Sequence, residues 1–362
     1  MPTDWNILQS KAIDALRFPM AVAVVVLHYS KTLILDASGP LRVLCILFQE
    51  GLCRLAVPCF FFISGYLFFT KLHSWDWSVW KTKIRRRLKS LLIPYLLWNI
   101  LAFLAYWGYA ALQEGGVPFS QEFAKYGGIR MFLSTGGGIP ISSQAFPVNG
   151  PLWFIRDLMY FVLLTPLIYG FLRITRVYGV LGLCLVFLAV RRIVPEGFLF
   201  FTIGSWMQLS GRNIVKTLAP AGKWLIPLSV ILLAATCLLT DVSDYWSRFS
   251  KFFFISAGIA ASFHTAASLE QNDRVHLSPF LVGSSFFIFA AHEVLILQNI
   301  SIPLVNAILP SGGDFWPCVA FFLVPALAVG ICLMLLRAMQ KFLPRTTALL
   351  TGGRKSQPAL TQ

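Results

Sequence analysis

The chain has 362 residues, of which 57% are hydrophobic, 15% aromatic and only 12% charged. Because soluble domains carry charge on roughly a quarter of their residues, this composition excludes an ordinary soluble protein and indicates a membrane protein. The net charge of +15 is typical of basic cytoplasmic loops, so we expect no nucleic-acid partner.

Long apolar segments recur along most of the chain and are separated by short polar loops. They predict an all-α, polytopic helix bundle of about ten transmembrane helices embedded in membrane lipids. The fifth and sixth segments are short for a span and flank the Arg191-Arg192 pair. In chain order the predicted spans are 12–35, 54–69, 91–112, 151–172, 177–190, 198–209, 224–240, 252–269, 280–300 and 315–336.

Lys and Arg are concentrated in the loops on the same side as the two ends of the chain. The positive-inside rule therefore predicts that both termini are cytoplasmic. The longest external loop, roughly 113–150, is rich in Gly, Ser and Pro and is either a lid over an acceptor site or a plain connector. We expect one transmembrane domain over 1–350 and a disordered cytoplasmic tail over 351–362.

The first span carries two ionisable side chains, Arg17 and His28. Their R-x10-H spacing corresponds to roughly three helical turns, which places both on one face about 16 Å apart along the axis. Imidazole is the usual general base near neutral pH, and a cation can hold the far end of a long substrate. Alternatively both are structural, with Arg17 paired to Asp14 and His28 hydrogen-bonded to a neighbouring helix.

The loop before the third span, KLHSWDWSVWKTKIRRRLKS, is the most basic part of the chain. Its Arg85, Arg86, Arg87 and Lys89 can bind the phosphates of a CoA thioester, because guanidinium groups offer paired donors to phosphate oxygens. The same residues can equally anchor the loop on anionic lipid, beside an interfacial belt of tryptophans.

The fourth span begins PLWFIRDLMYF, with Arg156 and Asp157 near the external side. These two either pair with each other or reach different partners, because neighbours on a helix point about 100° apart. An intramembrane ionisable group is a candidate functional residue by default.

The ninth span carries His292 and Glu293. Glu293 can orient a catalytic imidazole or line an acceptor pocket. The zinc-protease pattern H-E-x-x-H fails because Leu295 and Ile296 follow, and the seven cysteines form no C-x-x-C pair. We therefore expect no metal site.

Five blocks occur in one order across the predicted spans: R-x10-H (Arg17, His28), VPCFFFISGYLFF, RRRLKSLLIPYLLW, GPLWFIRDLMYF and FFIFAAH. Together they resemble the integral-membrane acyltransferase-3 family. The resemblance implies a bacterial inner-membrane O-acyltransferase that moves an acyl group, acetyl in the first instance, from cytoplasmic acyl-CoA to a hydroxyl of a glycan or lipid-linked sugar. It implies acyl-CoA as a co-substrate and no permanently bound cofactor.

The resemblance also suggests roles for individual residues. It implies that His28 is the essential histidine, that Arg17 is the basic residue of its motif, and that the arginine run with Lys89 helps to hold CoA. The family's spaced R-x-x-R is a contiguous Arg85–Arg87 triplet here, which leaves the individual roles open.

Around these residues we expect the following arrangement. Glu293 or Asp157 stabilises the imidazolium of His28, while the acceptor meets Arg156, Trp153 and His292. Homodimerisation is left open. The rival interpretation is a proton-coupled transporter or exporter of a small solute or glycan, with the same intramembrane groups acting as a proton relay.

Overall fold

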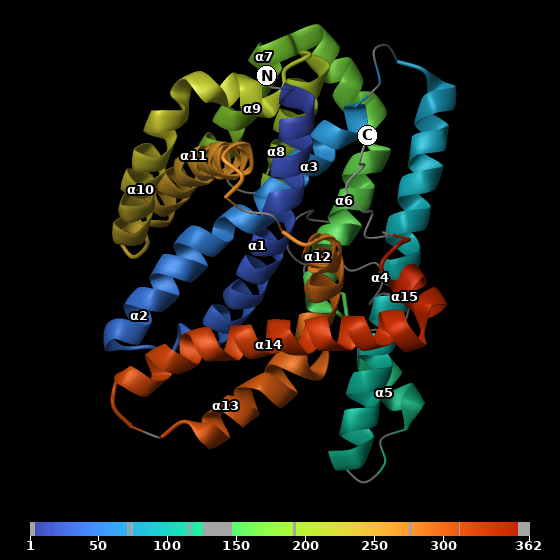
Figure 1. The fold of residues 1–362 in the computed structure, drawn as a ribbon, viewed down its shortest axis with the longest axis vertical. Helices are drawn as coiled ribbons and strands as arrows, with labels where there is room; N and C mark the ends of the chain where they lie inside the picture. The colour runs from blue at the N-terminus through green and yellow to red at the C-terminus, as the bar shows by residue number, and fades with distance from the viewer. Residues whose placement is uncertain are drawn as a thin grey trace.

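The computed structural model describes residues 4–70, 72, 75–113, 116, 118–125, 147–190, 193–274, 277–310 and 312–353. Over these residues the chain forms helices joined by turns and loops, with no strand among them. The predicted all-α helical bundle is therefore confirmed (Figure 1).

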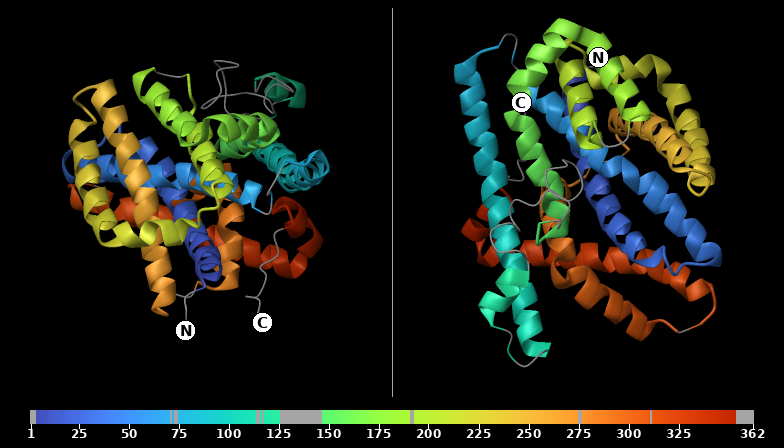
Figure 2. Two further views of the ribbon diagram at one scale, coloured as in Figure 1. Left: turned by 90° about the horizontal axis from the view of Figure 1, so that it is seen from above. Right: turned by 180° about the vertical axis from the view of Figure 1, so that it is seen from behind.

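Helix α1 (Trp5–Leu33) lies at the centre of the fold. On one side of it are α10 (Gly222–Leu239) and α11 (Asp244–Gln271), and on the other are α4 (Trp77–Gln113) and α6 (Trp153–Leu163), as Figures 1 and 2 both show. The carboxylate of Asp4 caps α1 by accepting hydrogen bonds from the backbone N–H groups of residues 6 and 7. A central helix can contact several neighbours at once, which suits α1 to carry site residues.

Eight helical stretches within the described ranges are long and apolar enough to cross a membrane, which identifies a multi-pass membrane protein. Two predicted spans differ from this set. The predicted sixth span is α8 (Glu196–Leu209), with only 14 residues. The predicted fourth span begins on α6, with only 11 residues. The fifth lies in α7 (Thr165–Ala189), which belongs to the set and is kinked at Arg176 (φ 55°, ψ −133°). Helices thus lie at all ten predicted positions, while the number that cross and the cytoplasmic termini stay predictions.

Two helix backbones approach closely where α3 (Ala56–Phe69) crosses α8. A Cβ added at Gly65 would collide with the backbone carbonyl of Phe201, and one at Gly204 would collide with that of Phe62. Small residues on both helices therefore permit this approach.

Before α3 the chain forms α2 (Gly39–Cys45), the π-helical turn η1 (Ile46–Gly51) and the 3₁₀ turn η2 (Leu52–Leu55).

Polar contacts fix α1 against its neighbours near its N-terminal end. Gln9 Nε2 donates to the hydroxyl of Tyr66 on α3 at 3.1 Å, and the backbone N–H of Ile214 donates to Gln9 Oε1 at 2.6 Å. Ile214 begins α9 (Ile214–Leu218), which leads through η5 (Ala219–Ala221) into α10. Because these groups are buried, their mutual hydrogen bonds set the register of α1 in the bundle.

The C-terminal helices close the bundle around α1. They are α12 (Pro279–Ala291), the π-helical segment η6 (His292–Ser301), α13 (Ile302–Ile308), α14 (Phe315–Phe342) and α15 (Pro344–Leu350). After α15, Thr351 is buried and a Cβ at Gly352 would collide with the carbonyl of Ser90 on α4. Gly352 therefore lies against α4, while the division into one domain over 1–350 and a tail over 351–362 stays a prediction. The rest of that tail, 354–362, lies outside the described residues, as do residues 126–146 of the predicted external loop, before which α5 (Phe119–Lys125) is formed.

Candidate active site

Two residues far apart in the sequence, His28 and Glu293, meet at the end of α1. The imidazole Nδ1 of His28 lies 3.3 Å from Oε2 of Glu293. Their side chains are 21% and 28% exposed, so the pair is neither sealed in the core nor freely solvated. The structure thus brings together the predicted base and one of its two predicted carboxylate partners.

His292 lies beside this pair and is fully buried. Its ring meets that of His28 edge to face, with centroids 5.1 Å apart. Its Nδ1 lies 2.9 Å from the carbonyl oxygen of Ile288, and because a carbonyl only accepts, this nitrogen carries the proton. Nε2 is then an acceptor, and it has no hydrogen-bond partner in the described parts of the chain.

The helix breaks directly after Glu293. Helix α12 ends at Ala291, and the backbone leaves helical geometry at Val294 (ψ 92°) and Leu295 (φ 60°). A positive φ at a bulky residue costs on the order of 1–3 kcal/mol, and such strain is typical of functional sites. The break therefore lies directly after the residue whose carboxylate faces His28.

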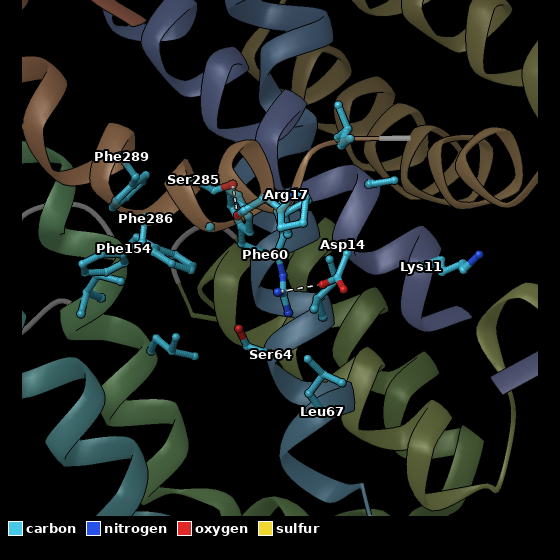
Figure 3. A pocket seen from close by; sticks show the side chains of 18 of the residues that line it. Lys11, Asp14, Arg17, Phe60, Ser64, Leu67, Phe154, Ser285, Phe286 and Phe289 are labelled. Atoms are coloured by element: carbon cyan, nitrogen blue, oxygen red, sulfur yellow. Dashed lines mark hydrogen bonds and ion pairs between the residues drawn. The ribbon is translucent and has the colours of Figure 1, made fainter. Parts of the chain in front are cut away.

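A cavity of about 820 Å³ opens among α1, α3, α6 and α12. Figure 3 shows Lys11, Asp14 and Arg17 along one side and aromatic rings, among them Phe154 and Phe289, along the other. Arg17 Nη1 is paired with Asp14 Oδ1 at 2.8 Å, which is the structural partner that the sequence predicted as an alternative. The arrangement offers cations to an anionic head and aromatic surface to an apolar arm.

Of the predicted phosphate-binding run, only Arg87 lines this cavity. Arg85, Arg86 and Lys89 are exposed on other faces of α4. One turn earlier on α4, Lys83 Nζ donates to the carbonyls of Phe68 and Thr70 at 2.8 and 2.7 Å. Its ammonium group therefore caps the C-terminal end of α3 and is not free to bind a ligand. The structure therefore separates one arginine from the rest of the run.

The aromatic side of the cavity leads towards the histidines. Phe289 lines the cavity and packs on Phe154, with ring centroids 5.5 Å apart. Phe289 also precedes His292 by one turn of helix. Neither His28 nor Glu293 is among the residues that line the cavity, and Phe289 is the lining residue of α12 that is nearest to His292 in the sequence.

Arg156 and Asp157 pair with each other in the core. The Nε and Nη2 atoms of Arg156 donate to Oδ1 of Asp157 at 2.9 and 2.7 Å, and the two side chains are 2% and 1% exposed. Glu293, rather than Asp157, is thus the carboxylate at His28. The predicted acceptor residue Trp153 packs with its ring 6.4 Å from that of Phe61.

Three side chains at this site could together bind a metal ion. His28, His292 and Glu293 offer atoms that all lie within 4.8 Å of one another. Two imidazoles and a carboxylate form a donor set known for zinc. The spacing also suits a base, its orienting carboxylate and a neighbouring acceptor, which needs no metal.

Asn149 is a site residue that sequence reasoning missed. Its side chain is fully buried, and its Nδ2 donates to the carbonyl of Ala290 at 2.8 Å, two residues before His292. The adjacent Gly150 lies so close to Glu293 that an added Cβ would be 3.0 Å from Oε2. The Asn-Gly pair in the sequence indicates a turn but carries no sign of this contact.

Comparison with known proteins identifies the family of this chain. The family model described as "Acyltransferase domain", acyltransferase-3, matches residues 10–337. The chain is 28% identical over 326 residues to the succinoglycan biosynthesis protein ExoH of Rhizobium meliloti (strain 1021), which covers 87% of this chain and 84% of that relative. No solved structure matches. The chain therefore belongs to the acyltransferase-3 family.

Proposed function

We propose that this protein is a multi-pass O-acyltransferase of the bacterial inner membrane. It transfers an acyl group from cytoplasmic acyl-CoA to a hydroxyl of a glycan or lipid-linked sugar, and the acyl group that we propose is acetyl. The observation that carries the proposal is the approach of His28 to Glu293, in a member of an acyltransferase family.

The cavity supports acyl-CoA as the donor. Arg17 and Arg87 line it together, and both can donate to phosphate oxygens. The aromatic side chains that line the other part suit the uncharged arm that carries the thioester. Arg17 and His28 are separated by roughly 16 Å along α1, so an extended arm held at Arg17 is required to bring its acyl end near His28.

The pair at the end of α1 supports general-base chemistry. Nδ1 of His28 lies 3.3 Å from Oε2 of Glu293, and when Nδ1 carries the proton, Nε2 is left as the base. Nε2 removes the proton of the acceptor hydroxyl while that oxygen attacks the thioester carbonyl. When the carbon–sulfur bond breaks, the imidazolium returns the proton to the CoA thiolate. The products are the ester and CoA, and Glu293 stabilises the imidazolium between the two proton transfers.

A saccharide acceptor is supported by the relative, whose name assigns it to succinoglycan biosynthesis. The unpaired Nε2 of His292 can accept a hydrogen bond from a sugar hydroxyl beside His28. The buried pairing of Arg156 with Asp157 favours a structural role for these two over direct binding of the acceptor.

The test uses the full chain in proteoliposomes with acetyl-CoA or succinyl-CoA as donor and succinoglycan fragments as acceptor. Free CoA and acylated saccharide are measured by mass spectrometry for the wild type and for His28→Ala. We expect both products from the wild type and neither above background from His28→Ala, although that variant still binds acyl-CoA in the cavity.

Two results would overturn the proposal. Equal transfer by His28→Ala would exclude His28 as the base. If the wild type bound neither acyl-CoA, the donor assignment would fail, and proton-coupled transport would become the better explanation of the intramembrane groups.

A further inference from the structure

Asn149 contacts the end of α12, and Gly150 lies beside Glu293, in a segment that no proposed chemical step uses. Asn149 precedes the 3₁₀ turn η4 (Gly150–Leu152), which begins at Gly150 and leads into α6. We infer that Asn149 is a positioning residue that holds Glu293 against His28. This inference rests on the proposed function.

The first contact that carries the inference is at the end of α12. The last carbonyls of a helix lack partners within that helix, and α12 ends at Ala291. The amide of Asn149 donates to one of these carbonyls, that of Ala290. It therefore fixes the last regular turn before the break that follows Glu293.

The second contact ties Asn149 to α4. Its backbone N–H donates to Oδ1 of Asn99 at 3.1 Å, and Asn99 Nδ2 donates to the carbonyl of Tyr95 at 2.8 Å. Both asparagine side chains are fully buried. Because buried amide hydrogen bonds are costly to break, they connect α4 rigidly with the end of α12.

The third contact is steric. Gly150 faces the Glu293 carboxylate, where an added Cβ would be 3.0 Å from Oε2. A side chain at this position would push the carboxylate away from its place beside Nδ1 of His28. Asn149 thus holds the backbone at Ala290, three residues before Glu293, and Gly150 leaves space for the Glu293 carboxylate.

The variants Asn149→Asp and Asn149→Ala test this inference. Asn149→Asp keeps the volume but removes the donor to Ala290. We expect kcat to fall about 10- to 100-fold, the range typical of residues that orient a reactive group, with the KM for acetyl-CoA unchanged. The matched control is Asn213→Ala, which removes side-chain hydrogen bonds to Trp5, to Asn6 and from Lys216 at the start of α9. The control should leave kcat unchanged.

A double-mutant cycle with Glu293→Gln separates positioning from general loss of structure. If Asn149 acts through Glu293, adding Asn149→Asp to Glu293→Gln should lower kcat by less than twofold. A full additional loss in the double variant would overturn the inference. If the wild type itself has no transfer that depends on His28, the proposed function fails.

Hydrogen exchange over residues 288–297 tests the contact independently of turnover. Exchange should rise in Asn149→Asp and in Gly150→Ala but not in Asn213→Ala. Unchanged exchange in both site variants would overturn the assignment, whatever the activity.

Discussion

Arg17 and His28 lie on the same helix but occupy different parts of the site. Arg17 lines the cavity together with Arg87, whereas His28 is outside the residues that line it and lies against Glu293. An acyl donor that reached from Arg17 to His28 would have its anionic head in the cavity and its reacting carbon beside His28. Substitutions near Arg17 should therefore alter donor binding, and substitutions near His28 should alter the chemical step.

The arginine triplet offers a comparison within one helix turn. Replacing Arg87 with Gln should raise the KM for acetyl-CoA about 10- to 100-fold, because a charge-assisted hydrogen bond contributes roughly 1.5–3 kcal/mol. The matched controls Arg85→Gln and Arg86→Gln alter exposed side chains outside the cavity and should leave KM within about twofold. Equal effects at all three positions would indicate general attraction by the basic loop.

The buried pair of Arg156 and Asp157 should behave as a structural unit. Removing one partner leaves an uncompensated buried charge, so Arg156→Met should destabilise the protein by about 3–5 kcal/mol. The double variant Arg156→Met with Asp157→Leu should recover most of this loss, since neither charge remains. Thermal unfolding in detergent measures both effects. A double variant that is stable but has lost acceptor binding would instead support the original prediction that Arg156 binds the acceptor.

The helices, and the placement of Arg17 and His28 on one of them, could be predicted from the sequence because these signals are local. The spacing of Arg17 and His28 follows from helix periodicity, and the apolar segments follow from the width of a bilayer. Which arginine of the Arg85–Arg87 triplet lines the cavity depends on how α4 is rotated in the bundle. The three consecutive arginines in the sequence do not reveal that rotation. The pairing of His28 with Glu293 depended on a helix break at Val294 and Leu295, where the sequence has neither Gly nor Pro.

The mutual pairing of Arg156 and Asp157 illustrates a different limit. Adjacent residues on a helix start about 100° apart, which favours separate partners. A long guanidinium side chain can nevertheless turn back to its neighbour, and burial of both groups makes that contact strongly preferred. Burial is a property of the packed bundle, so this pairing could be stated from the sequence only as one of two alternatives.

The crossing of α3 and α8 predicts a marked effect of adding a single methyl group. Gly65→Ala or Gly204→Ala should destabilise the protein by about 1–3 kcal/mol, because the new Cβ collides with a backbone carbonyl and the helices must separate. The control is Gly182→Ala in α7, where an added Cβ meets nothing within 4 Å. Thermal unfolding compares the three variants. An unchanged midpoint for Gly65→Ala would mean that the two backbones are not in contact.

The donor atoms of His28, His292 and Glu293 make zinc a useful probe of the site. The three atoms lie within 4.8 Å of one another, and small shifts would bring them to the bond lengths of about 2.0–2.2 Å that zinc requires. We expect added Zn²⁺ to inhibit transfer by occupying His28, and a chelator to reverse the inhibition. Mg²⁺ should not inhibit, because it prefers oxygen ligands. Glu293→Gln should weaken inhibition, since one charged ligand is lost. The chelator alone should leave wild-type transfer unchanged. Loss of transfer on chelation, with recovery on addition of zinc, would instead identify a resident metal and replace the general-base role proposed for His28.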